Sequence, residues 1–189
     1  MPFDLLIKNA RVCDGSGGPS FHGDVAVRGD RIVAVGEIAG EAVETVDASG
    51  LVIAPGFIDP HTHYDAQLVW DGLAQPSLEH GVTTIVPGNC SLSLAPVRAE
   101  HRELVGATFR KIEEMPKNAF EAGLSWSWQT FGEYVDAIRG GLGINVAPLV
   151  GHSLIRLWVM GEAARERVAT DAEIADMQQA LRECLAAGA

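Results

Sequence analysis

The sequence Gly56-Phe57-Ile58-Asp59-Pro60-His61-Thr62-His63-Tyr64-Asp65 sets two histidines and two aspartates directly behind a short apolar run. Alternate side chains of a β-strand point to the same face, so His61 and His63 would point together if the strand extends through them. One strand end would then supply two ligands for a divalent metal. A lone His-X-His pair is equally compatible with one histidine in an ordinary core or surface position, so the rest of the chain has to decide.

After Pro55 the pattern predicts short strands that alternate with helices. Strands are expected at 57–58, 82–86 and 144–150, and helical segments at 73–80, 96–115, 130–138 and from 170 onward. The last two helices open with capping boxes, Thr130 with Glu133 and Thr170 with Glu173. On the last helix one apolar stripe is expected, formed by Ile174, Met177, Leu181 and Leu185. This alternation is typical of parallel βαβ units.

Residues 1–55 differ from the rest of the chain, because their sequence pattern predicts β-strands and no helices. Five short strands are expected at 5–9, 24–28, 31–35, 43–46 and 51–54, with a hairpin turn at Gly29-Asp30. Such strands bury one face of a small sheet and bring few polar groups together. We therefore expect a structural domain over 1–55 and the chemistry in a second domain over 56–189.

Three successive predicted strands of the second domain are each followed by residues of the types that can bind metals. His61 and His63 follow the first strand, Cys90 follows the second, and His152 follows the third. In parallel barrels the functional groups lie at these carboxyl ends. Imidazole and thiolate donors together suit zinc, which activates bound water and polarises a carbonyl. Cys90 also has two rival interpretations, a small buried residue or a nucleophile.

Other polar residues near these strand ends have weaker interpretations. Asp59 and Asp65 would orient the histidines or lie at the surface. His152 would line the substrate pocket or form a local hydrogen bond, and Arg156 would bind a substrate carboxylate or lie at the surface. We expect surface positions for His22, His80 and His101, and packing rather than a pocket for Trp126, Trp128 and Phe131.

The run 56–63, placed after a small β domain, resembles the amidohydrolase superfamily. Pro87-Gly88-Asn89-Cys90 followed by Ser91-Leu92-Ser93-Leu94-Ala95-Pro96 resembles its N-acyl-D-amino-acid deacylase (D-aminoacylase) branch, although that branch often has glycine where this chain has Ser91. The resemblance implies that His61, His63 and Cys90 bind the metal, that the metal is Zn²⁺, and that a (β/α)₈ barrel lies beside a small β-sandwich. It does not assign His152 as a ligand.

The strand count predicts an incomplete barrel. A closed (β/α)₈ barrel takes about 250 residues, whereas 56–189 holds three to four βα units. We expect an N-terminal fragment of a longer protein. By the resemblance, the remaining histidine ligands and the aspartate that acts as general acid and base lie beyond Ala189, so the chain alone is expected to be inactive.

Composition narrows the possible partners. The chain has 47% hydrophobic and 21% charged residues, as a globular protein does, and 14 basic against 25 acidic residues give a net charge of -11. This charge argues against nucleic acid and anionic membranes as partners. The three cysteines form no CxxC pair and no secretion signal is evident, which favours a soluble, cytoplasmic protein. An oligomer is possible.

The expected function is therefore hydrolysis of the amide bond of small-molecule N-acyl-D-amino acids by metal-activated water. Two alternatives stay open. One is a cyclic-amide hydrolase similar to hydantoinases and dihydroorotases, which commonly use a modified lysine where this chain has Cys90. The other is a non-catalytic remnant whose open sheet edge is covered in an oligomer.

Overall fold

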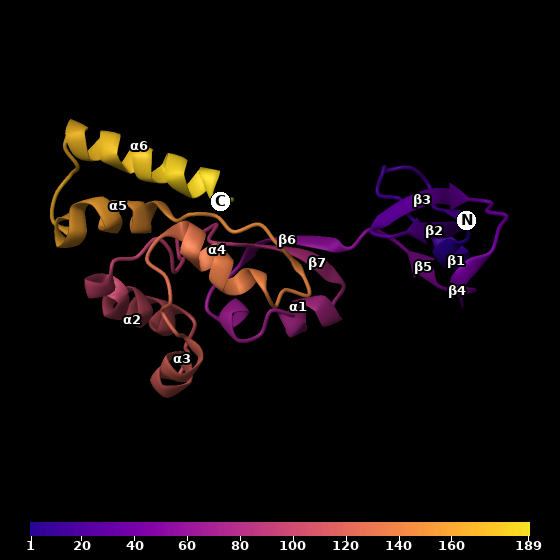
Figure 1. Ribbon diagram of the computed structural model, residues 1–189, viewed down its shortest axis with the longest axis horizontal. Helices are drawn as coiled ribbons and strands as arrows, with labels where there is room; N and C mark the ends of the chain where they lie inside the picture. The colour runs from indigo at the N-terminus through magenta and orange to yellow at the C-terminus, as the bar shows by residue number, and fades with distance from the viewer. The chain divides into compact units, whose positions relative to one another are not determined.

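A computed structural model describes residues 1–189 (Figure 1). The chain forms two compact units, Met1–Pro55 and Gly56–Ala189, here called the N-terminal and C-terminal units. The N-terminal unit consists of strands and turns, whereas the C-terminal unit combines strands with helices.

The N-terminal unit is a single five-stranded sheet. Its strands are β1 (Phe3–Val12), β2 (Phe21–Arg28), β3 (Arg31–Gly36), β4 (Ala42–Asp47) and β5 (Val52–Ile53). The order is β3-β2-β1-β4, and β5 also pairs with β1. β1 and β2 are antiparallel, as are β2 and β3, whereas β4 and β5 run parallel to β1. Each expected strand is present, and Gly29 closes the β2–β3 turn with a φ of 58°.

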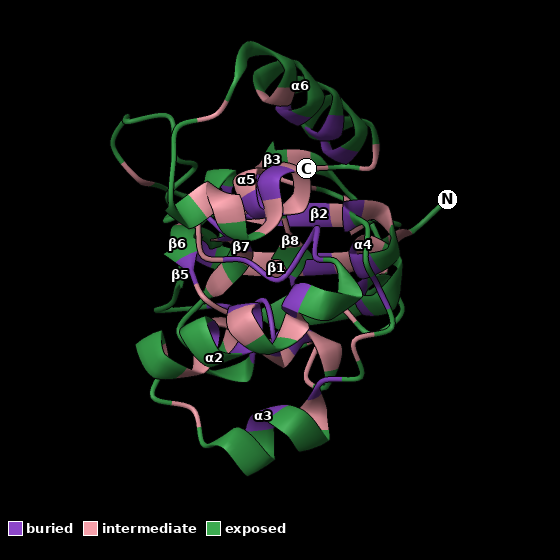
Figure 2. Cartoon of the chain, turned by 90° about the vertical axis from the view of Figure 1, so that its left-hand side faces the viewer, coloured by how far each residue is buried: buried purple, intermediate pink, exposed green.

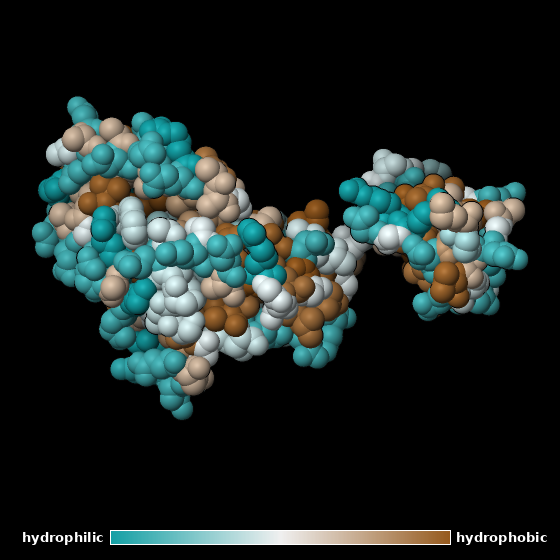
Figure 3. Space-filling view, viewed as in Figure 1, coloured by the Kyte–Doolittle hydropathy of each residue, from teal (hydrophilic) through white to brown (hydrophobic).

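A two-sheet sandwich, expected from the family resemblance, is not formed within this unit. Its core is small and consists mainly of Ala10, Val12, Val25 and Ala48. Apolar side chains remain exposed on several strands, among them Ile32, Val33, Val35, Val43 and Val52; Figure 3 shows hydrophobic residues at the surface of this unit. The sequence pattern identified strands correctly, but it did not identify which strand faces are covered.

In the C-terminal unit, β6 (Phe57–Thr62), β7 (Val82–Pro87) and β8 (Asn145–Val146) form a parallel sheet in that order. The third strand is much shorter than expected. Two backbone hydrogen bonds nevertheless extend its pairing with β7, from Ala147 N to the Ile85 oxygen (3.0 Å) and from Leu149 N to the Pro87 oxygen (2.9 Å). The sheet is open, and no closed barrel is present.

Helices connect and cover these strands. They are α1 (Gln75–Glu79), α2 (Arg102–Ile112), α3 (Lys117–Gly123), α4 (Phe131–Arg139), α5 (His152–Met160) and α6 (Asp171–Ala186), with short 3₁₀ turns η1 (Gln67–Val69), η2 (Ala99–His101) and η3 (Gly161–Arg165). Both capping boxes are confirmed, at Thr130 with Glu133 and at Thr170 with Glu173. The helix expected at 96–115 is shorter at both ends, and α3 was not expected.

The core of the C-terminal unit lies between the sheet and these helices (Figure 2). Aromatic rings fill much of it: Trp128 lies 5.4 Å from Trp126 and 5.3 Å from Tyr134 between ring centroids. The buried Trp128 Nε1 donates a hydrogen bond to the Leu94 oxygen at 2.9 Å. The interpretation of Trp126, Trp128 and Phe131 as packing residues is confirmed.

The expected stripe on the last helix is only partly right. Met177 is buried on α6, together with Ala180 and Cys184, whereas Ile174, Leu181 and Leu185 are at least 40% exposed. α6 packs along α5 (Figure 1), and its buried residues include the small side chains of Ala180 and Cys184 beside Met177. No helix of the chain has the length and apolar character needed to cross a membrane.

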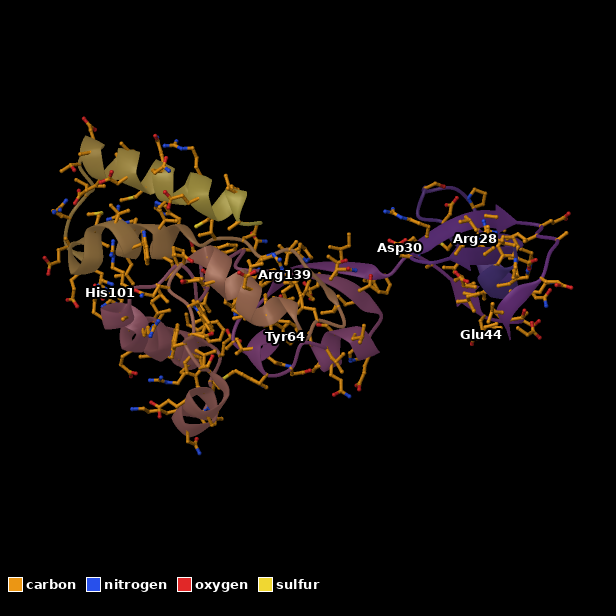
Figure 4. The ribbon with its side chains drawn as sticks, viewed as in Figure 1. Arg28, Asp30, Glu44, Tyr64, His101 and Arg139 are labelled. Carbon is orange, nitrogen blue, oxygen red and sulfur yellow. The ribbon has the colours of Figure 1, made fainter.

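One histidine lies differently from the expectation. His101, at the end of η2, is only 8% exposed, and its Nδ1 has no hydrogen-bond partner (Figure 4). It lies near Gly161, which begins η3: a Cβ built on this glycine would be 3.7 Å from the ring, at ordinary contact distance. The surface assignment of His101 was therefore wrong, because it depended on neighbours in sequence rather than on this contact. His22 and His80 are exposed, as expected.

The first prediction concerns the acid sensitivity of the α6 N-terminus. Hydrogen bonds from Arg167 and from the Thr170 backbone lower the pKa of Glu173 from 4.5 to about 2. A carboxylate with a lowered pKa in the fold stabilises the protein at higher pH, and this stabilisation is lost as the pH falls toward the folded value. Glu173→Gln should therefore lose stability less steeply than the wild type between pH 5 and 2.

Urea unfolding followed by tryptophan fluorescence measures this effect. All four tryptophans, Trp70, Trp126, Trp128 and Trp158, belong to the C-terminal unit. Glu166→Gln removes the same charge from an exposed neighbour whose carboxylate makes no hydrogen bond, and serves as the control. Parallel pH profiles for wild type and Glu173→Gln would contradict the prediction.

Candidate metal centre

The parallel pairing of β6 with β7 brings two strand ends to the same edge of the sheet. Thr62 of β6 lies opposite Pro87 of β7. His61 and His63 lie on either side of Thr62, and the turn that carries Cys90 follows directly after Pro87. The Asn89 side chain donates a hydrogen bond to the Pro60 oxygen at 2.8 Å, which ties this turn to β6.

The ligand atoms of His61, His63 and Cys90 converge. His63 Nε2 lies 3.3 Å from His61 Nε2 and 3.1 Å from Cys90 Sγ. All three donor atoms lie within 4.8 Å of one another. Nitrogen and sulfur ligands about 2.0–2.3 Å from one tetrahedral ion lie roughly 3.3–3.6 Å apart. The spacing and the donor types therefore fit a single metal ion.

The turn after β7 has a constrained backbone. Gly88 has a φ of 91°, and a Cβ at this position would lie 2.3 Å from the Leu149 oxygen. Ser91 has a φ of 69°, in the region that favours glycine. Glycine adopts a positive φ more easily than other residues, which gives a physical reason why the resembling branch often has glycine after the cysteine. In this chain Ser91 adopts the same φ although it has a side chain.

The other nitrogen of His63 faces an acidic residue that sequence reasoning missed. His63 Nδ1 pairs with Glu113 Oε1, and both side chains are about one quarter exposed. Glu113 follows α2 and lies fifty positions from His63 in the sequence. No local pattern marks it, because Glu113 and Glu114 resemble any acidic pair at the end of a surface helix.

The two aspartates beside the histidines occupy different environments. Asp59 is half-buried, and its Oδ1 accepts a hydrogen bond from the His61 backbone N at 3.2 Å. Asp65 is buried, with an Oδ2 that has no hydrogen-bond partner. Burial raises the pKa of Asp65 to about 7; hydrogen bonding by its own backbone amide and the charge of His63 oppose the rise, and Glu113 adds to it. Neither aspartate hydrogen-bonds an imidazole ring.

Tyr134 lies behind Asp65 and connects this strand end to the core. Its hydroxyl donates a hydrogen bond to the Asp65 backbone oxygen at 3.0 Å. Burial, and secondarily the charge of Asp65, raise the pKa of Tyr134 well above its ordinary value. The phenol therefore stays neutral and acts as a hydrogen-bond donor.

His152 is not part of the convergent group. It lies at the N-terminal end of α5, is exposed, and lines a groove that also contains Val150, Ile155 and Ile174. Its strand is aligned with the other two, but the chain turns into α5 directly after Gly151. Of the three strand ends expected to converge, the structure brings two together.

Arg156 lies beside a cavity that reaches Cys90. The cavity has a volume of about 390 Å³, and its walls include Leu104, Val105 and Leu154. Arg156 Nη2 donates hydrogen bonds to the backbone oxygens of Ala164 (2.9 Å) and Arg167 (3.1 Å). This arginine therefore ties α5 to the segment after it, and part of its hydrogen-bonding capacity is used within the protein.

Comparison with known proteins identifies the family of the chain. Residues 44–188 match the amidohydrolase family. The chain therefore belongs to the amidohydrolase family, as the 56–63 run and the Gly88-Asn89-Cys90 element indicated.

Individual relatives share a narrower set of activities. D-aminoacylase of Alcaligenes xylosoxydans xylosoxydans is 42% identical over 190 residues, which cover 100% of this chain and 37% of that protein. A D-aminoacylase structure studied for its binuclear metal centre has a TM-score of 0.81 at 36% identity, and the match covers 100% of this chain and 37% of that one. N-acyl-D-glutamate deacylase from Bordetella bronchiseptica, solved with zinc and a phosphonate inhibitor, has a TM-score of 0.74 at 32% identity over 98% of this chain and 37% of that one. The chain thus spans a little over one third of these relatives.

The second prediction tests the support of the Cys90 turn. A Cβ on Gly151 would lie 2.4 Å from the Ser91 oxygen and 3.1 Å from Ser91 Cα. Gly151→Ala must therefore displace the turn or α5, and such overpacking costs about 1–3 kcal/mol. Urea unfolding followed by tryptophan fluorescence should show a lower free energy of unfolding.

Gly140→Ala is the matched control. Gly140 has a φ of -74°, and a Cβ there would have nothing within 4 Å. Its free energy of unfolding should stay within about 0.5 kcal/mol of the wild type. Equal effects of the two substitutions would show that the contact of Gly151 with Ser91 does not constrain the turn.

Proposed function

We propose that this chain supplies metal ligands to a hydrolase that cleaves the amide bond of N-acyl-D-amino acids. The observation that carries the proposal is the convergence of His61, His63 and Cys90 at adjacent strand ends. The relatives named D-aminoacylase and N-acyl-D-glutamate deacylase supply the substrate class. The substrate is a small molecule, and three free cysteines suit a reducing cytoplasm.

Zinc is the metal that we propose for this site. Two imidazole nitrogens and one thiolate match its preference for nitrogen and sulfur donors. The Bordetella relative was solved with zinc, and the D-aminoacylase structure has a binuclear centre. A bound zinc ion would activate water and polarise the acyl carbonyl.

The residues of this chain would bind the metal and shape its surroundings. His61 and His63 would offer their Nε2 atoms and Cys90 its sulfur. The Asn89 side chain holds the Cys90 turn against β6, and this contact would fix the spacing between the thiolate and the two imidazoles. The cavity beside Cys90 would accept an apolar part of the substrate, and Arg156 and His152 remain candidates for substrate contacts.

We further propose that β6, β7 and β8 are the first strands of a (β/α)₈ barrel and that residues 1–55 form a separate structural domain. The parallel order of the strands and the helices between them support this arrangement. The candidate ligands lie at the carboxyl ends of strands, where such barrels carry their active sites.

The third prediction tests the metal ligands. Cys90→Ser replaces a thiolate by a poorer zinc donor, so the purified variant should retain much less zinc than the wild type. After exchange for Co²⁺, the wild type should show a thiolate-to-cobalt charge-transfer band in the near ultraviolet, and Cys90→Ser should lack it. Metal analysis and absorption spectra measure both effects.

Cys13→Ser is the control for this experiment. Cys13 is exposed and belongs to the N-terminal unit, whereas the convergent group belongs to the C-terminal unit. This variant should keep both the zinc content and the cobalt band. A folded Cys90→Ser protein with unchanged zinc content would refute the assignment of Cys90 as a ligand.

The fourth prediction concerns activity. The complete reading frame that contains these residues should release free amino acid from N-acetyl-D-amino acids, and far more slowly from the L-enantiomers. Chelation should abolish the activity, and zinc should restore it, because the metal supplies the attacking water. Hydrolysis of hydantoins or dihydroorotate without hydrolysis of N-acyl-D-amino acids would favour a cyclic-amide hydrolase instead.

A further inference from the structure

The two nitrogens of His63 face different partners. Nε2 points toward the group formed with His61 and Cys90, at 3.3 and 3.1 Å. Nδ1 lies on the opposite side of the ring and pairs with Glu113 Oε1. One imidazole thus connects the candidate metal centre with a carboxylate that belongs to neither β6 nor β7.

This arrangement determines which nitrogen carries hydrogen. An ionised carboxylate only accepts hydrogen bonds, so His63 Nδ1 must donate to Glu113. A neutral imidazole that is protonated on Nδ1 leaves the lone pair of Nε2 free, and a metal binds that lone pair. Without Glu113, the ring would be free to adopt the opposite tautomer, with hydrogen on Nε2, and to rotate.

Glu113 lies at the C-terminal end of α2. Glu113 N donates a hydrogen bond to the oxygen of Phe109, which is fully buried, at 2.9 Å. Met115 N bonds the Arg110 oxygen at 3.0 Å, and Glu114 between them has a φ of 51°. These two hydrogen bonds belong to the last turn of α2 and define its end. The Glu113 side chain extends toward His63 from this helix end.

The surroundings of Glu113 differ from those of an ordinary surface ion pair and from those of a metal ligand. Its side chain is 26% exposed, whereas surface ion pairs with little effect on stability are much more open to water. It is also not among the residues whose donor atoms converge on one point, which are His61, His63 and Cys90. Its carboxylate contacts a candidate ligand and not the candidate ion position.

We propose that Glu113 is a positioning residue that fixes the tautomer and ring orientation of His63 for metal binding. The inference rests on the metal centre proposed above. Partners of this kind on ligand histidines typically change metal affinity by 10–100-fold. Glu113 then links α2 to the metal centre, although α2 supplies no ligand.

Zinc affinity, measured by competition with a chromophoric chelator, tests the inference. Glu113→Ala should bind Zn²⁺ about 10–100-fold more weakly than the wild type. Glu113→Gln, which keeps an acceptor oxygen without the charge, should fall between them. Glu114→Ala removes the adjacent exposed carboxylate and should stay within about twofold of the wild type. Circular dichroism confirms that each variant is folded, and the cobalt band should persist because Cys90 is unchanged.

Nitrogen NMR of the metal-free protein gives a second readout that needs neither metal nor activity. At a pH where the imidazole is neutral, His63 should carry its hydrogen on Nδ1 in the wild type and shift toward Nε2 in Glu113→Ala. Wild-type zinc affinity in folded Glu113→Ala, or an Nε2-protonated His63 in the wild type, would overturn the role of Glu113 alone. A wild-type protein with Nδ1-protonated His63 but no zinc binding would instead overturn the metal centre, and with it the purpose of the contact.

Discussion

The parallel pairing of β6 with β7 is the constraint on which the candidate site depends. Parallel strands place their carboxyl ends at one edge, and the opposition of Thr62 to Pro87 sets the relative heights of those ends. A shift of one residue would turn His61 and His63 to the other face. The distances of 3.3 and 3.1 Å from His63 Nε2 to His61 Nε2 and Cys90 Sγ are therefore a consequence of strand register.

Close backbone contacts hold that register. Gly56 directly precedes β6, where a Cβ would lie 2.1 Å from the Thr83 side chain, and a Cβ on Gly151 would lie 2.4 Å from the Ser91 backbone oxygen. These glycines allow neighbouring segments to approach more closely than any other residue would permit. The Cys90 turn is thus held by close backbone contacts, of Gly88 with Leu149 and of Gly151 with Ser91.

Local patterns predicted the parts of the structure that depend on neighbours in sequence. The capping boxes at Thr130 and Thr170 were predicted because capping needs only residues three positions apart. The convergence of His61, His63 and Cys90 was predicted because strand ends in a parallel sheet share an edge.

Features that depend on tertiary packing were not predictable in this way. Glu113 meets His63 across fifty positions, and His101 is buried by a contact with the start of η3. The burial of Asp65 depends on the position of α4, whose Tyr134 donates to its backbone oxygen. His152 follows its strand as expected, but α5 begins at that residue and carries it away from the other strand ends. Sequence position identified the strand end but not the direction of the chain after it.

The candidate centre has nitrogen and sulfur donors at its middle and acidic side chains around them. The three convergent donors are nitrogen and sulfur atoms, whereas the carboxylates of Glu113 and Asp65 lie behind them and contact or influence His63. Oxygen donors on the ion itself would suit magnesium or calcium better. The Glu113 carboxylate, which contacts His63, would still favour a bound cation, because its charge acts over several ångströms in a partly buried site. The donor atoms of the proposed centre suit zinc, and this neighbouring carboxylate would add attraction without changing that preference.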